Sequence, residues 1–285
     1  MENQALKALL DQITQFFLSA FYFPGLGWKL VLVAIALGLV FGVLWMLAYW
    51  PSLKKNKILL FVGVISAALT WAAIAFVQIP LQTWSGQALL HFWSPVTLSR
   101  WLLLAGIPVI LLSGIVQEGA KLLPVVFYWV GNSHKLDART GLIAGAIAGA
   151  GFGIFEAVWV HNTMFAAGWT WQSVQTGGVI ALAGLWERFF AVGFHIVVSA
   201  LAGYGLAKGL GWQFYLLASF LHGALNYGVI LMQKGLLNVT GIEIYIAAFA
   251  VILTAAVLWI RWKKTPDSPE TDAPAPSPLN DKPEA

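Results

Sequence analysis

Seven apolar stretches follow one another along the chain, and each is long enough to cross the roughly 30 Å hydrocarbon core of a membrane. A segment in lipid must satisfy its backbone hydrogen bonds internally, which favours helices. The sequence therefore predicts an all-α fold, a polytopic transmembrane helical bundle of seven spans, or eight if an N-terminal helix also inserts. The stretches are residues 28–50, 58–79, 101–130, 140–162, 178–207, 213–233 and 242–262.

The composition supports a membrane protein. Of the 285 residues, 59% are hydrophobic and 10% are charged, whereas soluble domains carry about a quarter charged residues. The net charge of +4 does not indicate nucleic acid binding, because the basic residues lie at the ends of the apolar stretches. The expected partner is a lipid bilayer, with no nucleic acid. The lack of cysteine excludes disulfides and cysteine nucleophiles.

Three regions are expected along the chain. Residues 1–24 carry apolar side chains at helical spacing and predict an amphipathic helix at the membrane interface. Residues 25–264 hold the bundle, in which residues 80–100 are polar and interrupted, so that this segment is expected to lie along the interface without crossing. The Pro-rich, acidic residues 265–285 predict a disordered tail.

The distribution of lysine and arginine predicts the orientation in the membrane. Loops 51–57, 131–139 and 206–211 and the segment after the last span are basic, while the alternate loops are poor in these residues. Basic loops stay in the cytoplasm. The multi-pass chain is therefore expected to have its C-terminus in the cytoplasm.

Ionisable and polar residues lie at membrane depth in four consecutive spans. A charge there costs roughly 2.5–3.5 kcal/mol on insertion scales, so such residues are usually paired or functional. Three acids lie well inside the spans. With their basic and polar neighbours, the candidates are Glu118, Lys121, Glu156, Glu187, Arg188, His195, His222 and Asn226.

The spacings predict which of these side chains share a helix face. Glu118 and Lys121 are three residues apart, and His222 and Asn226 are four apart. In the fourth span a glycine recurs at every fourth position, which allows close helix packing; these are Gly141, Gly145, Gly149 and Gly153.

Structural interpretations stand beside the functional one. The pairs Glu118–Lys121 and Glu187–Arg188 could be ion pairs that fix helix registry, and Asn226 alone would be an interhelical hydrogen-bonding residue. The other histidines lie in or beside loops and carry no functional signal; they are His91, His134 and His161.

The set favours hydrolysis by an activated water. A carboxylate and an imidazole in a dry cavity can activate water as base and relay, and a histidine with an asparagine one turn away can donate to an oxyanion. The motifs GxSxG and HExxH are absent. Glu118, His195 and His222 could bind Zn²⁺, but their separation on three helices favours a site without a metal or other cofactor.

Four motifs resemble, in order and in span placement, those of PrsW-type intramembrane proteases, which share a superfamily with YhfC-like proteins and type II CAAX prenyl proteases. They are QEGAK, GAGFGIFEA, ERFFAVGFHIVVSALAGYGLA and HGALN, within about residues 100–230. The resemblance implies a bacterial cytoplasmic (inner) membrane protease of glutamic or metallo type. It assigns catalysis to Glu118, Glu156, His195, His222 and Asn226, supported by Lys121.

The chain departs from the family pattern at three positions. Gln117 stands where the family usually has a first glutamate, Val160 stands where an aromatic residue is common, and Asn226 replaces a frequent aspartate. If the first acid of the family activates water, then Glu118 or Glu156 must substitute for it here.

The predicted function is therefore an intramembrane endopeptidase that cleaves a membrane-embedded or membrane-associated protein or peptide. A non-catalytic membrane scaffold of the same superfamily is the alternative, and Gln117 favours it. A proton-coupled transporter is a third class, because chains of glutamate and histidine also relay protons; the lack of an evident internal repeat counts against it.

Overall fold

The computed structural model describes residues 23, 25–49 and 59–263, and every regular element in these ranges is helical. Seven helical stretches there are long and apolar enough to cross a membrane, which confirms the predicted bundle. They are Trp28–Tyr49, Leu59–Phe92, Leu102–Gly131, Ala138–Ala166, Trp171–Ala207, Gly211–Gln233 and Val239–Trp262. The predicted surface helix near the N-terminus and the predicted tail 265–285 lie outside the described residues.

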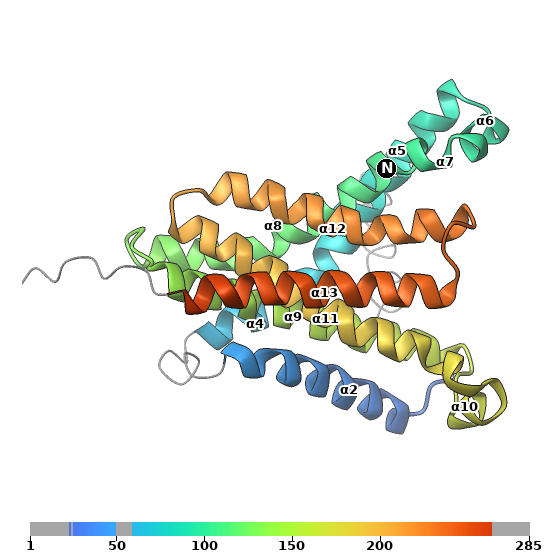
Figure 1. The fold of residues 1–285 in the computed structure, drawn as a ribbon, viewed down its shortest axis with the longest axis horizontal. Helices are drawn as coiled ribbons and strands as arrows, with labels where there is room; N and C mark the ends of the chain where they lie inside the picture. The colour runs from blue at the N-terminus through green and yellow to red at the C-terminus, as the bar shows by residue number, and fades with distance from the viewer. Residues whose placement is uncertain (1–22, 24, 50–58, 264–285) are drawn as a thin grey trace, which may run out of the picture.

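Figure 1 shows the arrangement of the described elements. In chain order they are α2 (Trp28–Met46), η1 (Leu47–Tyr49), α4 (Leu59–Ala73), η2 (Ile74–Gln78), α5 (Ile79–Phe92), α6 (Pro95–Arg100), α7 (Leu102–Ala105), α8 (Ile107–Gly131), α9 (Ala138–Ala166), α10 (Trp171–Gly177), η3 (Gly178–Leu182), α11 (Ala183–Ala207), α12 (Gly211–Gln233) and α13 (Val239–Trp262).

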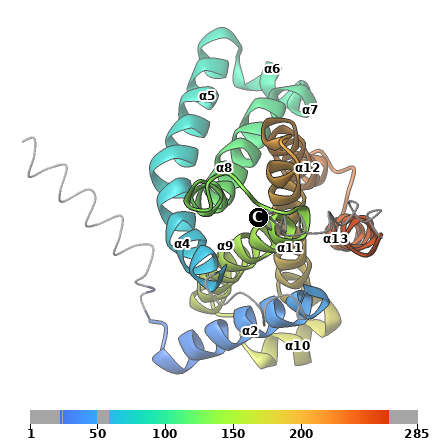
Figure 2. The ribbon, with the colours of Figure 1, turned by 90° about the vertical axis from the view of Figure 1, so that its left-hand side faces the viewer.

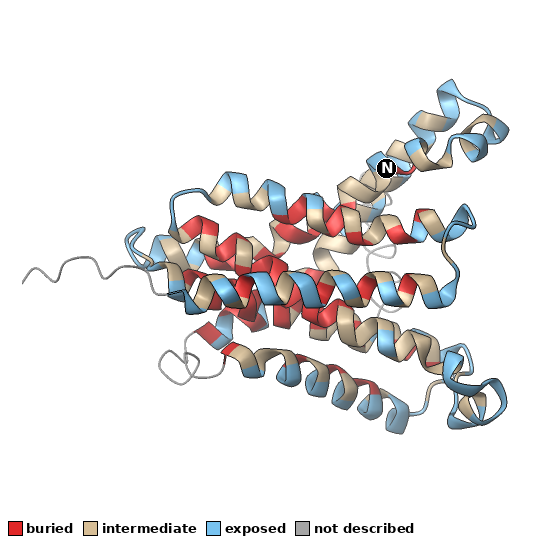
Figure 3. Ribbon diagram, in the orientation of Figure 1, coloured by how far each residue is buried: buried red, intermediate tan, exposed pale blue. Residues whose placement is uncertain are grey.

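Helices α9 and α11 form the centre of the bundle, and most of their middle turns are buried (Figure 3). Their backbones touch: a methyl group added at Gly145 would overlap the carbonyl of Ser199, and one at Gly149 would overlap the carbonyl of His195. The glycine repeat predicted to allow close packing does so, and it fixes the position of His195 against α9.

Helix α8 approaches α12 in the same way. A methyl group at Gly114 would overlap the carbonyl of Ser219. One turn beyond this contact, α8 carries Glu118 and α12 carries His222. The close approach therefore lets two polar side chains from different helices meet inside the bundle.

The outer helices present apolar side chains to their surroundings. Figure 2 shows α9 and α11 in the middle, with α4 on one side, α13 on the other and α2 along a third. Outward residues such as Leu39, Val43 and Ile252 are at least half exposed. A stripe of small residues faces inward instead, and Gly38 and Gly42 pack α2 against Ile154 of α9. This distribution suits helices that lipid surrounds.

The segment 80–100 differs from the sequence prediction. It is not interrupted near residue 80: α4, η2 and α5 form one continuous helical run to Phe92, and the break falls at Trp93–Ser94, where Ser94 caps α6. Pro80 lies in the first turn of α5, directly after the π-helical turn η2. Such wide turns are a known way to accommodate an irregularity inside a helix. In Figure 1, α5, α6 and α7 extend away from the bundle.

Candidate active site

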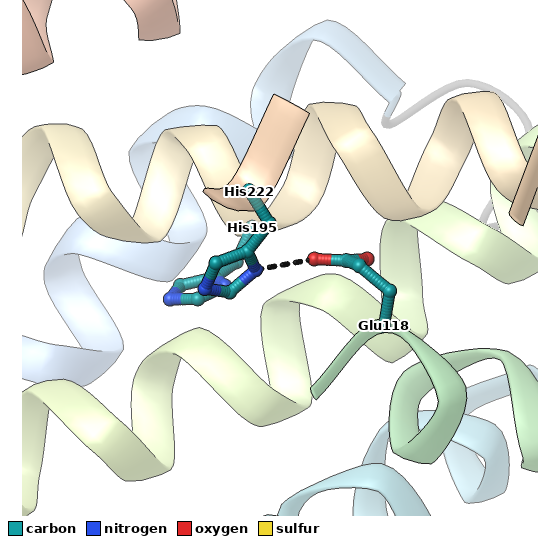
Figure 4. Close-up of side chains that lie close together, drawn as sticks. All are labelled: Glu118, His195 and His222. Atoms are coloured by element: carbon teal, nitrogen blue, oxygen red, sulfur yellow. Dashed lines mark hydrogen bonds and ion pairs between the residues drawn. The ribbon is translucent and has the colours of Figure 1, made fainter. Parts of the chain in front are cut away.

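Four helices bring ionisable side chains together inside the bundle. Glu118 and Lys121 come from α8, Glu156 from α9, His195 from α11 and His222 from α12. The side chains of Glu118 and Lys121 are fully buried, and His195 and His222 are 3% and 2% exposed. Figure 4 shows the two imidazoles side by side, next to the carboxylate of Glu118. The similar depth of these residues in four spans predicted a buried polar site, but not the distances between them.

Glu118 uses one of its two oxygens for contacts. Its Oε1 accepts hydrogen bonds from Nζ of Lys121 and from Nδ1 of His222, the latter at 2.6 Å. Its Oε2 is buried and has no hydrogen-bond partner among the described residues. A buried polar atom without a partner is uncommon and suggests a missing donor, such as a water or a ligand.

The neighbours of His195 determine its tautomer. Its Nδ1 lies 2.9 Å from Nζ of Lys121, and its Nε2 lies 2.9 Å from Oε2 of Glu156. A lysine ammonium has hydrogens to donate and no acceptor. Nδ1 of His195 therefore accepts a hydrogen bond from Lys121. Nε2 carries the ring hydrogen and donates a hydrogen bond to Glu156.

A second ion cluster continues from Glu156 toward the surface. Nη1 of Arg188 lies 3.0 Å from Glu156, and Nε of Arg188 donates to Glu187 at 2.6 Å. The side chains of Arg188, Glu156 and Glu187 are 14%, 16% and 24% exposed. The seven ionisable residues predicted from sequence thus form one continuous chain of polar contacts.

Asn226 forms an interhelical hydrogen bond, as its structural interpretation predicted. Its Nδ2 donates to Oγ of Ser113 at 2.9 Å, and Ser113 donates to the carbonyl of Ile110. One amide hydrogen of Asn226 is therefore used within the bundle, and the second remains for another acceptor.

A cavity of about 380 Å³ is lined by Glu156, Glu187 and Arg188 and by the two histidines; Glu118 and Lys121 lie behind this lining. One part of its lining is polar and includes Glu156, His195, His222 and Asn226. The other part is an apolar wall from α12 and α13, formed by Leu225, Val229, Met232, Val239, Ile242 and Ile246. Tyr245 of α13 donates to the carbonyl of Ala224 on α12 and ties the two wall helices together. A cavity that is polar on one side and apolar on the other suits a peptide segment.

Two further polar residues were not predicted as part of the bundle interior, one partly buried and one fully buried. Glu243 of α13 also lines the cavity, and its Oε2 has no partner among the described residues; its place at the start of the last apolar stretch was the available signal. His161, expected in or beside a loop, is fully buried within α9, next to Phe41 and Phe165. His161 falls at the end of the predicted span 140–162, and because α9 continues to Ala166 it lies within the helix and not beside a loop.

Three of these residues could hold a metal ion. The donor atoms of Glu118, His195 and His222 all lie within 4.8 Å of one another, so the expectation that separate helices keep them apart was wrong. One carboxylate and two imidazoles suit Zn²⁺, and Glu156 behind His195 is a typical second contact for a metal-bound histidine. The ammonium of Lys121 contacts two of the three donors, so a metal would compete with it.

Fold and site together define a polytopic membrane protein with a buried acid–histidine site. Residues 56–257 match the family model of the PrsW family intramembrane metalloproteases, and the chain belongs to this family. The match confirms the resemblance and extends it beyond residues 100–230. Searches of curated proteins and of solved structures found no match.

Proposed function

We propose that this protein is an intramembrane endopeptidase whose active site is the cavity lined by His195 and His222, with the carboxylate of Glu118 bonded to His222 directly behind the cavity wall. One observation carries the proposal: Oε2 of Glu118 is a buried acceptor without a partner, on a carboxylate whose other oxygen is held by Lys121 and His222. A water that donates to this oxygen would be oriented and activated by it. General base catalysis of this kind contributes about 10²–10⁴-fold to the rate.

In the proposed reaction, the water attacks the carbonyl carbon of the scissile peptide bond and gives a proton to Oε2 of Glu118. The tetrahedral intermediate then collapses as the same proton moves to the leaving nitrogen. The products are a carboxylic acid and an amine, so one water is consumed for each bond. Lys121 compensates the charge of Glu118 throughout, and the remaining amide hydrogen of Asn226 is available to the oxyanion.

His222 contributes to the oxyanion site only when both of its ring nitrogens carry hydrogen. A neutral ring that donates from Nδ1 to Glu118 leaves Nε2 as an acceptor. In the neutral state the ring therefore orients Glu118 and does not donate to the oxyanion.

Glu156 is the weaker candidate for the base. Its Oε2 already accepts hydrogen bonds from Nη1 of Arg188 and from Nε2 of His195. One oxygen of Glu118 is held by two donors in the same way, so the difference lies in the second oxygen: that of Glu118 is buried without a partner, whereas the side chain of Glu156 is 16% exposed. We assign Glu156, with Arg188 and Glu187, to the positioning of His195.

A metallopeptidase mechanism uses the same residues. If Zn²⁺ is the cofactor, Glu118, His195 and His222 would hold it, and the ion would polarise the substrate carbonyl or acidify a bound water. Lys121 would then leave its contacts with Glu118 and His195. Purified protein treated with a strong zinc chelator, then supplied with zinc, distinguishes the two catalytic types.

The test of the proposal is cleavage of membrane-spanning peptides by the purified protein in detergent. We expect the wild type to cleave at least one member of a broad panel, Glu118→Gln to be inactive, and the exposed-site control His91→Ala to retain full activity. Equal activity of wild type and Glu118→Gln would refute the role of Glu118. Peptide binding without cleavage by the wild type would support the scaffold alternative, which Gln117 favours.

We further propose the bacterial cytoplasmic membrane as the location, with the C-terminus in the cytoplasm. The basic loops 51–57, 131–139 and 206–211 support this orientation. Because the chain has no cysteine, single cysteines placed in alternate loops and labelled from outside intact cells would test it. Labelling of a cysteine near Lys264 from outside would contradict it.

A further inference from the structure

Three glutamines form a ladder of side-chain amides between α5 and the cavity. Nε2 of Gln82 donates to the carbonyl of Val109 at 2.9 Å. Nε2 of Gln78 donates to Oε1 of Gln82 at 3.3 Å, and Nε2 of Gln117 donates to Oε1 of Gln78 at 2.9 Å. No other side-chain amide chain of this length occurs in the hydrogen bonds of the described residues.

The ladder has a fixed polarity. A backbone carbonyl can only accept, so Gln82 must turn its nitrogen toward Val109 and its oxygen toward Gln78. Gln78 must then present nitrogen to Gln82 and oxygen to Gln117. Gln117 is left with its nitrogen in the ladder and its Oε1 at the free end. The direction of all three amides thus follows from one carbonyl.

The free end of the ladder is an unpartnered acceptor at the cavity. Gln117 is 5% exposed, lines the cavity beside His195 and His222, and its Oε1 has no partner among the described residues. Leaving a buried acceptor unsatisfied costs about 1–3 kcal/mol. A donor supplied by water or by a substrate N–H would remove that cost.

The backbone at the start of the ladder is unusual. The π-helical turn η2 ends at Gln78, and Gln82 lies one turn further on the same helix face. Single π-helical turns inside α-helices are frequent at functional sites. Gln78 is the last residue of this turn, and its side chain contacts Gln117 of α8.

We infer that Gln117 is a substrate- or water-binding residue of the proposed active site, and that Gln78 and Gln82 are positioning residues that present its oxygen to the cavity. This inference rests on the proposed peptidase function. Gln117 accepts a hydrogen bond from the attacking water or from a substrate backbone N–H, and the ladder prevents the amide from turning its nitrogen inward.

The first test compares two substitutions at Gln78 by their kcat and KM. Glutamic acid at this position keeps an oxygen toward Gln117 whether or not it is ionised, whereas leucine of similar size provides no acceptor. We expect Gln78→Leu to lower kcat about tenfold to a hundredfold, which corresponds to about 1.4–2.7 kcal/mol and lies within the cost of leaving a buried polar group unsatisfied, and Gln78→Glu to retain most of kcat. Equal kcat in Gln78→Leu and wild type, or equal losses in both variants, would overturn the inference.

A second test does not depend on activity. The thermal midpoints of Gln78→Leu, Gln117→Leu and the double variant form a double-mutant cycle. Non-additive shifts are expected, because either single change removes the same hydrogen bond. Additive shifts would overturn the ladder. If the wild type cleaves no peptide, the proposed function fails, and this cycle still decides whether Gln78 holds Gln117.

Discussion

The two ion clusters of the site differ in burial and in how completely their charges are matched. The inner cluster of Glu118, Lys121 and His222 is almost entirely buried, yet one carboxylate oxygen has no partner among the described residues. The outer cluster of Glu156, Arg188 and Glu187 is partly exposed, and its arginine is shared by two carboxylates. A general base needs an oxygen that is free to bind water. We therefore assign catalysis to the inner cluster and the positioning of His195 to the outer cluster.

The largest expected effect is a difference in kcat between substitutions in the inner cluster and in the outer cluster. Glu118→Gln removes the proposed base but keeps the size of the side chain, and kcat should fall by about 10²–10⁴-fold. Glu156→Gln should lower kcat much less, because it acts through His195. Peptide cleavage rates of the two purified variants give the comparison. A larger loss of kcat in Glu156→Gln than in Glu118→Gln would make Glu156 the base and Glu118 the positioning residue.

The second expected effect is a difference in the free energy of unfolding between variants of the two clusters. Lys121→Met leaves the buried charge of Glu118 without its partner, and the free energy of unfolding should fall by about 3–5 kcal/mol. The double variant Lys121→Met with Glu118→Gln should recover much of this loss. Unfolding in mixed detergents measures both. If the inner cluster binds metal, Lys121→Met should also bind zinc more tightly than the wild type.

The outer cluster should tolerate the loss of one charge. Glu187→Gln keeps an oxygen near Arg188, and Arg188 keeps its contact with Glu156. The expected loss in the free energy of unfolding is about 1–2 kcal/mol, with kcat within about twofold of wild type. A loss of unfolding free energy as large as that of Lys121→Met would remove the proposed difference between the clusters.

A carboxylate outside the spans provides the reference for both clusters. Asp137 caps α9, and its Oδ1 accepts from the backbone nitrogens of Arg139 and Thr140. Burial raises the pKa of Asp137, but its hydrogen bonds with Thr140 and Arg139 lower the pKa by more than burial raises it. The net pKa therefore lies below its ordinary value. The cap therefore stabilises the fold above the ordinary aspartate pKa and loses this contribution as the pH falls through the lowered pKa.

Asp137→Ala should lower the free energy of unfolding by about 1 kcal/mol or less at neutral pH. The difference from wild type should shrink as the solution is acidified below about pH 4. Thermal midpoints of both proteins along a pH series test this, and a difference that grows on acidification would contradict the assignment. Asp137 needs no buried partner, in contrast to Glu118.

Sequence reasoning reached the fold and most of the candidate site because both depend on local signals. Apolar stretches of sufficient length predicted the seven spans, and the cost of charge in lipid singled out Glu118, Lys121 and His195. Distances between helices were not accessible in this way. The approach of Glu118, His195 and His222 depends on backbone contacts at Gly114 and Gly149, and the spacing within one helix says nothing about it.

Hydrogen-bond direction was also beyond sequence reasoning. The tautomer of His195 follows from Lys121 on one side and Glu156 on the other, and the orientation of Gln117 follows from the carbonyl of Val109 through two other amides. The helix at 79–92 was misjudged because Pro80 and several polar residues suggested an interruption, whereas the π-helical turn before Pro80 allows the helix to continue.

The glycine contacts between α9 and α11 have a consequence for movement. Two helices whose backbones touch over several turns cannot slide or separate without losing all of these contacts together. They are therefore expected to form the rigid part of the bundle. His195 and Glu156 are both attached to it. Any widening of the cavity for an incoming polypeptide therefore falls to the opposite wall, where α12 and α13 meet through larger side chains and the hydroxyl of Tyr245.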